Sequence, residues 1–164
     1  MNIKKILINS FKEGLEAVKP ENIIKNSLPE PPKGRTFVIG AGKAAASMAK
    51  AIEVNWPRNL PLNGSVITRY KHSLKTKKIK IYESGHPMPD TAGMKAANSF
   101  ISNIKDLDSN DLLLCLISGG GSSLMSVPQK GLNMNDLRHV TKDLLNSGAE
   151  ISEINTVRKH LSKI

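Results

Sequence analysis

Residues 112–126 read LLLCLISGGGSSLMS, an apolar run that changes abruptly into three glycines flanked by serines. The run from Leu112 to Ile117 predicts a buried β-strand, and its continuity is typical of a central strand covered on both faces. Cys115 is expected to pack there as a small apolar side chain. Glycines after such a strand leave backbone N–H groups accessible to a ligand, and ligands of open α/β sheets bind at the carboxyl ends of the strands. The stretch therefore predicts both the fold class and the position of a binding site.

The rest of the chain alternates between strand and helix patterns. Further strands are predicted at RTFVIG (35–40), NGSVITR (63–69) and KIKIYES (78–84). Apolar residues at helical spacing predict helices over residues 3–18, 41–53, 90–104, from 133 or 135 to 144, and from 152 onward. This alternation predicts an α/β fold, a Rossmann-like, mainly parallel sheet with helices on both faces.

The last predicted helix carries Ile154, Val157, Leu161 and Ile164 on one face and has no terminating signal. We therefore expect residues 1–164 to be the N-terminal portion of a longer protein, with a sheet that is incomplete at the C-terminus.

The composition of the chain indicates which kinds of partner the protein is expected to have. The chain has 164 residues, a formal net charge of +10 and one cysteine, which excludes an internal disulfide. A local basic run comprises Lys71, Lys75, Lys77, Lys78 and Lys80. The run lacks the interleaved aromatic residues of single-strand binders, so it predicts a solvated surface without nucleic acid. No stretch reaches the roughly 18 apolar residues of a membrane span, and we expect a cytoplasmic protein that does not contact membranes.

The first candidate site is VIGAGKAAA (38–46), where a strand leads through Gly40 and Gly42 into a helix. A helix N-terminus with accessible backbone N–H groups favours an anion. Lys43 opposes the helix dipole at this position, a conflict that a bound carboxylate or phosphate would resolve. The alternative is a solvent-facing lysine beside a structural turn. The spacing Gly40, Gly42, Ala45 also fits a loose dinucleotide-binding pattern, whereas the Walker A pattern is not met.

The second candidate site is the serine- and glycine-rich loop itself. Three successive glycines form a nest of N–H groups, and serine hydroxyls add further donors suited to oxyanions. Its members are Ser118, Gly119, Gly120, Gly121, Ser122 and Ser123. Serine nucleophilic catalysis is not favoured, because Leu124 occupies the position of the last glycine in the G-x-S-x-G pattern.

Two further stretches supply candidate side chains. His86 and Asp90 follow a predicted strand in SGHPMPD (84–90). His86 either contacts substrate as an acid or base or stiffens a proline turn, while Asp90 is interpreted as a helix cap. Arg158 lies next to the apolar face of the last helix and is either a partly buried anion clamp or part of a solvated basic helix.

Four of these stretches occur together in the order found in one family. They are GAGKAAASMA (40–49), ESGHPMPD (83–90), LISGGGSSL (116–124) and EINTVRKHLSKI (153–164). With them the chain resembles the N-terminal domain of the glycerate 2-kinase family, whose members have often been labelled hydroxypyruvate reductases. The resemblance implies that residues 1–164 are the N-terminal portion of the large domain. The remainder of that domain and the C-terminal domain are absent from this sequence.

The resemblance also implies an activity: a kinase that phosphorylates the 2-hydroxyl of D-glycerate to 2-phosphoglycerate, with ATP and Mg²⁺. The substrate-contacting lysine of the family falls on Lys43, its serine- and glycine-rich loop on residues 118–123, and its basic helix on Arg158 and Lys159. The metal ligands are not assigned. A fragment of this length is expected to be inactive alone and to need the missing half, in the same chain or as a partner.

Two other functions stay open from the residues. An NAD(P)H-dependent hydroxypyruvate reductase fits the loose glycine pattern, with Arg69 available for an NADP phosphate, although no acidic residue ends the next strand to hold an NAD ribose. A non-catalytic module that binds phosphosugars or nucleic acid fits the basic surface, and it predicts salt-sensitive binding to an oligonucleotide.

Overall fold

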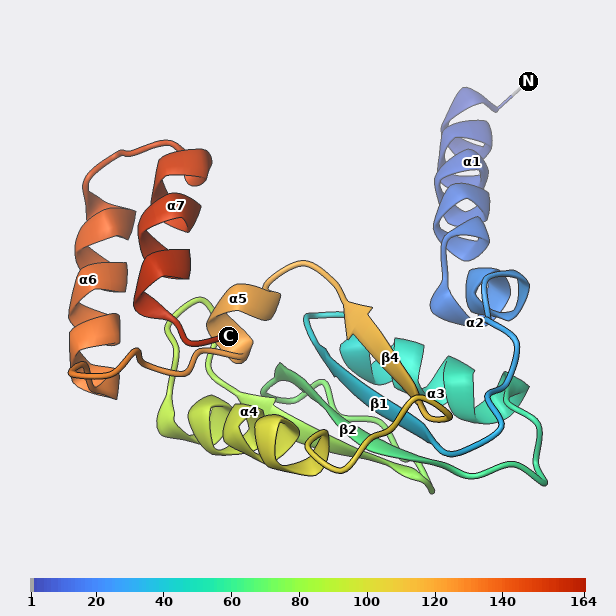
Figure 1. Ribbon diagram of the computed structural model, residues 1–164. Helices are drawn as coiled ribbons and strands as arrows, with labels where there is room; N and C mark the ends of the chain where they lie inside the picture. Colours follow the sequence, from blue (N-terminus) through green and yellow to red (C-terminus); the bar gives the residue numbers. More distant parts are fainter. Residues whose placement is uncertain (1) are drawn as a thin grey trace.

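The computed structural model describes residues 2–164 and contains a four-stranded, entirely parallel sheet with the order β3-β2-β1-β4 (Figure 1). The strands are β1 (Thr36–Ala41), β2 (Leu62–Arg69), β3 (Ile79–Ser84) and β4 (Leu112–Ile117). The chain moves outward from β1 to β3 and then returns to the other side of β1 to form β4. The strand order therefore reverses between β1 and β4, and at such a point the strand ends form a crevice. The predicted α/β class is confirmed.

Helices cover both faces of the sheet and divide the core in two. On one face α3 (Ala45–Asn55) buries Ala49 and Ile52 against Val38 and Val66. On the other face α4 (Thr91–Asn103) and the short α5 (Gly121–Leu124) enclose a second cluster around Phe100. The two clusters follow from the alternation of side chains along each strand.

The apolar run 112–117 forms an edge strand, which corrects the prediction of a central strand covered on both faces. Leu113 and Ile117 are exposed at 38% and 58%, and Cys115 is exposed rather than packed. The cause is the position of α4, which packs on β2 and β3 and leaves the adjoining face of β4 open. Leu116 points to the opposite face and is buried under α3.

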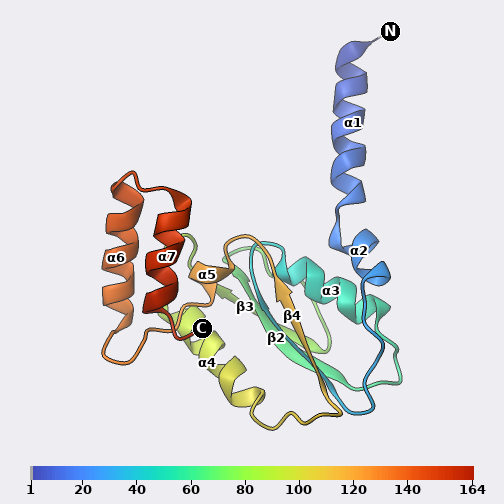
Figure 2. The same cartoon turned by 45° about the horizontal axis from the view of Figure 1, so that its top comes forward.

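The opening helix forms as predicted but packs on little else. α1 (Ile3–Ala17) has no buried residue and projects away from the sheet (Figure 2). It leads through α2 (Pro20–Ile23) and the 3₁₀ turn η1 (Ile24–Asn26), where the buried Ile24 joins the core on the α3 side. The apolar side of α1, which includes Leu7 and Phe11, therefore faces solvent in this chain.

The last two helices, α6 (Met134–Asn146) and α7 (Ile151–Leu161), pack against each other as a hairpin. A capping box at Asn133 begins α6. The prediction that this helix continues to Ile164 is wrong, because α7 stops at Leu161 and the backbone of Ser162 is extended. The backbone N–H of Lys163 donates to Val127 O (2.7 Å) and that of Gln129 to Leu161 O (3.0 Å). These bonds to the segment after α5 replace the next helical turn.

Arg35 and Asp111 join the starts of β1 and β4. Arg35 donates its backbone N–H to Asp111 Oδ1 (2.6 Å) and its Nη2 to Asp111 Oδ2 (2.7 Å). The same Nη2 donates to Asp106 O (2.7 Å). The hydrogen bonds from Arg35 lower the pKa of Asp111 from 3.8 to about 2.

This pair predicts an acid-sensitive contribution to stability. Because the pKa of Asp111 is lower in the folded state, ionised Asp111 stabilises the fold above about pH 4, and the contribution is lost as the pH falls toward 2. Urea unfolding should show that Asp111→Asn is less stable than the wild type at neutral pH and that the difference shrinks below about pH 4. The exposed Asp143→Asn variant is the control. A difference that does not vary with pH would contradict the assignment.

Glu53 of α3 holds the start of β3. Its carboxylate accepts the backbone N–H groups of Lys77 (2.8 Å), Lys78 and Ile79 (2.6 Å). Three successive donors thereby find an acceptor where the long β2–β3 connection ends, so a side chain of α3 sets the position at which β3 begins.

We expect Glu53→Gln to lower the free energy of unfolding by about 1–3 kcal/mol, because the charge-assisted hydrogen bonds become neutral and the amide nitrogen that replaces Oε2 cannot accept the N–H of Lys77. Urea denaturation measures the loss. Glu13→Gln, an exposed change on α1 with the same loss of charge, should stay close to the wild type. Equal stability of the Glu13 and Glu53 variants would show that the hydrogen bonds accepted by Glu53 contribute nothing.

Candidate anion-binding site at the strand ends

The two glycine loops predicted as binding sites lie in direct contact. Beyond β1, the N–H of Lys43 donates to Gly119 O (2.9 Å) and that of Ala44 to Ser118 Oγ (3.1 Å). In return the N–H of Ser118 donates to Ala41 O (3.1 Å). The loops therefore form one structural unit at the carboxyl ends of β1 and β4, as the shared sheet edge predicted.

Glycine is needed in the first loop for close approach to β4. Gly42 has a φ of +144°, and a Cβ there would collide with the side chain and backbone of Ser118. Gly40 lies inside β1, where a Cβ would collide with Leu116 of β4. The space beside both glycines is thus filled by the protein itself, and the first two N–H groups after Gly42 are already bonded.

The second loop retains free donors. Among residues 2–164, the backbone N–H groups of Gly119 and Gly120 have no acceptor. Gly120 adopts the left-handed conformation, with φ at +89°. Gly121 and Ser123 differ, because the N–H of Gly121 donates to Ser118 O (3.2 Å) and the hydroxyl of Ser123 to Gly120 O (3.1 Å). The loop therefore offers two adjacent amides, a suitable arrangement for an oxyanion.

Two predicted side chains lie beside these amides. The side-chain Cε of Lys43 is 3.7 Å from the position that a Cβ on Gly119 would take. The Nε2 atom of His86 is 2.6 Å from the corresponding position at Gly120. Lys43 is exposed and forms no ion pair with any residue of 2–164, whereas His86 is half-buried. A cis peptide bond joins His86 to Pro87.

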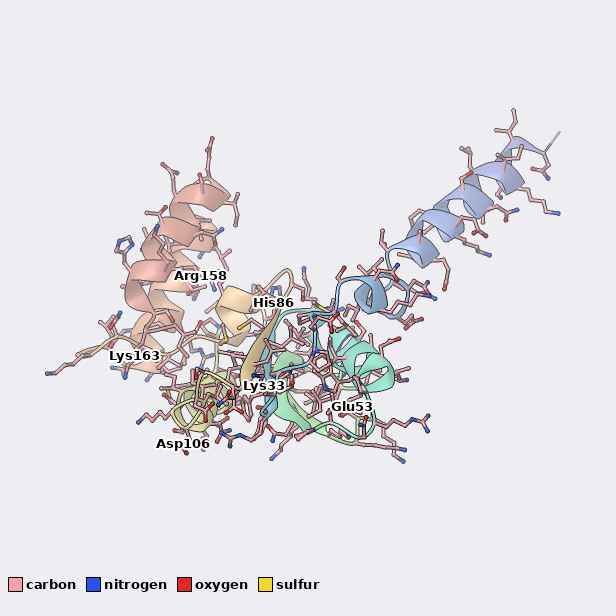
Figure 3. All side chains as sticks on the ribbon, turned by 45° about the vertical axis from the view of Figure 1, so that its right-hand side comes forward. Lys33, Glu53, His86, Asp106, Arg158 and Lys163 are labelled. Atoms are coloured by element: carbon pink, nitrogen blue, oxygen red, sulfur yellow. The ribbon has the colours of Figure 1, made fainter. Side chains whose placement is uncertain are left out.

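His86 is surrounded by positive charge. Burial of the imidazole, followed by the charges of Lys43, Arg69 and Arg158, lowers the pKa of His86 below its ordinary value of 6.5. Arg158 reaches this region from α7, far along the chain (Figure 3). Burial lowers the pKa of Arg158, and its Nη2 atom is buried without a hydrogen-bond partner among the described residues. We call Lys43, Arg69, His86 and Arg158 the basic cluster.

Arg69 is the member of this cluster that the sequence did not place in the anion site. The sequence indicates Arg69 only as a contact for an NADP phosphate. Its position as the last residue of β2 was the available signal, since residues at strand ends face the binding edge of such sheets.

Asp90 is a helix cap, as predicted, and also links two strand ends. It accepts the N–H of Gly93 at the start of α4 (2.9 Å), the N–H of Gly85 after β3 (2.9 Å), and the hydroxyl of Tyr70 after β2 (2.7 Å). The residues next to Tyr70 and Gly85 are Arg69 and His86. Asp90 thus sets the spacing between these two members of the basic cluster.

The described residues include no group of three or more histidine, cysteine or acidic side chains placed to hold a metal ion. Within residues 2–164, no helix has the length and apolar character needed to cross a membrane.

Comparisons with known proteins agree with this fold and its motifs. Residues 6–164 match the family described as "Domain of unknown function (DUF4147)", and the chain belongs to this family. It is 40% identical over 164 residues to a D-glycerate 2-kinase of Thermotoga maritima and 37% identical over 176 aligned positions to a glycerate 2-kinase of Pyrococcus horikoshii. It is also 44% identical over 164 residues to an Agrobacterium vitis protein provisionally named hydroxypyruvate reductase.

These alignments cover 99%, 100% and 100% of this chain, but 39%, 39% and 37% of the respective relatives. The chain therefore spans about two fifths of the length of the curated relatives it matches.

Solved structures give the same result. The crystal structure of the Thermotoga maritima glycerate kinase superposes with a TM-score of 0.86 at 40% identity, covering 99% of this chain and 39% of that one. A Pyrococcus horikoshii protein gives 0.84 at 37% identity, covering 100% and 40%. The resemblance to glycerate 2-kinases is confirmed at the level of the family and of the α/β fold.

The charges around His86 predict how its titration responds to substitution. Lys43→Gln removes the charge that, after burial, contributes most to lowering the pKa of His86. That pKa should therefore rise toward 6.5 yet stay below it, because the ring remains half-buried. NMR titration of the imidazole measures this change, and Lys95→Gln on the exposed side of α4 is the control. An unchanged or lower pKa of His86 in Lys43→Gln would show that the charge of Lys43 does not act on the imidazole.

Proposed function

We propose that this chain supplies the N-terminal part of the large domain of a glycerate 2-kinase, which transfers a phosphoryl group from ATP to the 2-hydroxyl of D-glycerate. The observation that carries the proposal is the pair of free amides at Gly119 and Gly120 beside Lys43 and His86. Kinases position anionic groups and neutralise charge on the transferring phosphoryl oxygens, and free N–H groups with a nearby ammonium perform both tasks.

Each residue has a role that follows from its chemistry. Lys43 pairs with the carboxylate of glycerate or with the transferring phosphoryl group, and the amides of Gly119 and Gly120 bind anionic oxygens of substrate or nucleotide. His86, kept neutral by burial and by its cationic neighbours, accepts a hydrogen bond from a substrate hydroxyl. Gly40 and Gly42 act indirectly. They allow β1 to approach β4 closely, and this approach positions the amides of Gly119 and Gly120.

The family implies Mg²⁺, but the residues of this chain do not fit a protein-held cation. The basic cluster contains three cationic side chains and an imidazole, while Mg²⁺ binds oxygen ligands, chiefly carboxylates and phosphates. The nearby carboxylate of Asp90 already accepts three hydrogen bonds. The use of Mg²⁺ therefore stays a prediction, as do the cytoplasmic location and the need for a C-terminal half.

The reductase alternative is supported by the name of the Agrobacterium vitis relative. Against it, the N–H groups of Lys43 and Ala44, which a dinucleotide pyrophosphate would need, are bonded to the 118–119 loop. Fluorescence titration with NADPH discriminates between the two functions, because a kinase predicts no saturable binding. A nucleic-acid module predicts tight, salt-sensitive retention of an oligonucleotide, and the kinase predicts only weak retention.

Substitution of Lys43 tests the kinase proposal. In a complete relative, alanine at the position of Lys43 should lower kcat/KM for D-glycerate by about 10²–10³-fold, since it removes a charge that stabilises developing negative charge. In the present chain, Lys43→Ala should weaken D-glycerate binding measured by calorimetry, and Lys50→Ala on α3 should not. Near-normal turnover of the alanine variant would remove this lysine from the mechanism.

A further inference from the structure

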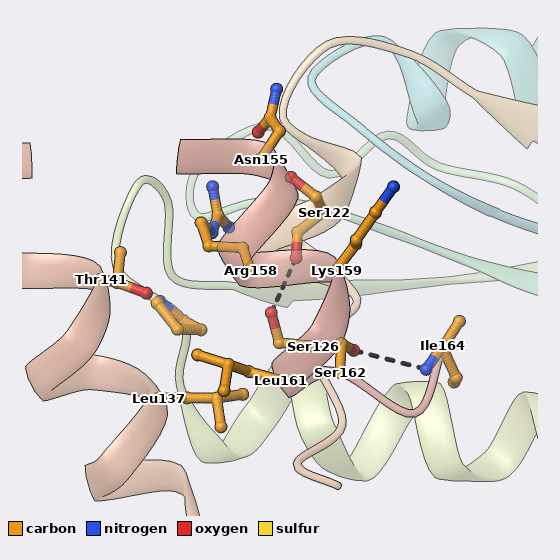
Figure 4. Close-up of a pocket in the computed structure, with 11 residues that line it drawn as sticks. Ser122, Ser126, Leu137, Thr141, Asn155, Arg158, Lys159, Leu161, Ser162 and Ile164 are labelled. Carbon is orange, nitrogen blue, oxygen red and sulfur yellow. Dashed lines mark hydrogen bonds between the residues drawn. The ribbon is translucent and has the colours of Figure 1, made fainter. Parts of the chain in front are cut away.

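A pocket that shares Arg158 with the basic cluster lies between α7, α6 and the short helix α5. Its volume is about 290 Å³. Arg158, Lys159 and Asn155 of α7 line it together with Ser122 of α5 (Figure 4). Neither Lys43 nor the two free amides of Gly119 and Gly120 are among its walls. We call it the α5–α7 pocket.

The pocket carries more positive than negative charge. Arg158 and Lys159 both line it and no acidic side chain does, while the α-carboxylate of Ile164 forms no ion pair with either among residues 2–164. The Nη2 atom of Arg158 is buried and has no hydrogen-bond partner among residues 2–164. A buried cationic donor without a partner is costly, and a bound anion would remove that cost.

Neutral donors complete the arrangement. The hydroxyl of Ser122 and the amide of Asn155 form no hydrogen bond within the described chain, so both are available to a ligand. Ser126 is different, because its hydroxyl already donates to Ser122 O (2.7 Å). Two cations and two neutral donors suit a tetrahedral dianion better than a planar monoanion, which has only two oxygens to satisfy them.

The walls are held together before a ligand arrives. The segment that follows α5 and the end of α7 are joined by the bonds from Lys163 to Val127 and from Gln129 to Leu161. The side chain of Gln129 adds a bond to Ser162 O (3.1 Å). Since Arg158 lies one turn before Leu161, this junction sets its position relative to Ser122. Such preorganisation lowers the entropy lost on binding.

We propose that the α5–α7 pocket is a phosphate-binding subsite, separate from the Lys43 loop, with Arg158 as its principal ligand. The proposal rests on the proposed function only for the origin of the phosphate, which belongs either to the nucleotide or to the phosphorylated acid. Phosphate binding itself does not require that the chain be a kinase.

Titration of the ¹⁵N-labelled 164-residue chain with inorganic phosphate, at constant ionic strength, tests the subsite. Amide signals of Ser122, Asn155 and Arg158 should shift together with one dissociation constant. Arg158→Gln should raise that constant about tenfold, because a charge-assisted hydrogen bond is lost. Arg138→Gln, the same change on the exposed side of α6, should leave it within about twofold.

Two further variants keep the result decisive. Asn155→Ala retains Arg158 and should raise the constant about threefold, so the test survives if Arg158→Gln does not fold. Lys50→Ala, an exposed change on α3 outside both sites, should leave the constant unchanged within about twofold. Phosphate binding at Ser122, Asn155 and Arg158 in a chain that binds no D-glycerate would support the subsite while counting against the kinase proposal, so the two proposals can fail separately.

Competition identifies the source of the phosphate. Displacement of inorganic phosphate by ATP assigns the subsite to the nucleotide, and displacement by 2-phosphoglycerate assigns it to the phosphorylated acid. Phosphate that neither compound displaces would overturn the link to the reaction. An absence of shifts, shifts confined to the residues around Lys43, or equal losses in Arg158→Gln and Arg138→Gln would overturn the subsite itself.

Discussion

The close approach of β1 and β4 is the constraint on which the candidate site depends. Gly40 and Gly42 leave no side chain between the two strand ends, and the 118–120 loop occupies the space that results. The hydrogen bonds from Lys43 and Ala44 to that loop then hold it in place. In this position the Gly119 carbonyl and the Ser118 hydroxyl face the first loop, and the amides of Gly119 and Gly120 have no acceptor within the described chain. The free donors of one loop are therefore a consequence of the bonded donors of the other.

The distribution of charge follows the same division. Arg35 meets Asp111 at the amino ends of the strands, so the charge there is compensated. At the carboxyl ends, Lys43, Arg69 and Arg158 surround His86 without an ion pair among the described residues. A cationic cluster that lacks carboxylate partners is unfavourable unless an anion joins it. This asymmetry gives the +10 net charge a local meaning that composition alone did not provide.

Much of this arrangement was predictable from local pattern. Apolar periodicity and turn residues predicted the four strands and the main helices, and the parallel sheet predicted that the glycine loops meet at one edge. The environment of β4 was not predictable, because its apolar run reads the same whether a helix covers it or not. The end of α7 was missed because its apolar spacing continues to Ile164, whereas hydrogen bonds to Val127 and Gln129, distant in sequence, end the helix. Arg69 and the α5–α7 pocket depend on tertiary placement, which periodicity does not encode.

The joint between Arg35 and Asp111 lies at the opposite rim of the sheet from the glycine loops, separated from them by the full length of β1 and β4. We therefore expect substitutions at this pair to change how firmly the two strands are held together without moving the free amides at their other ends. Scaffold stability and ligand binding can then be altered by substitutions at opposite ends of the same two strands.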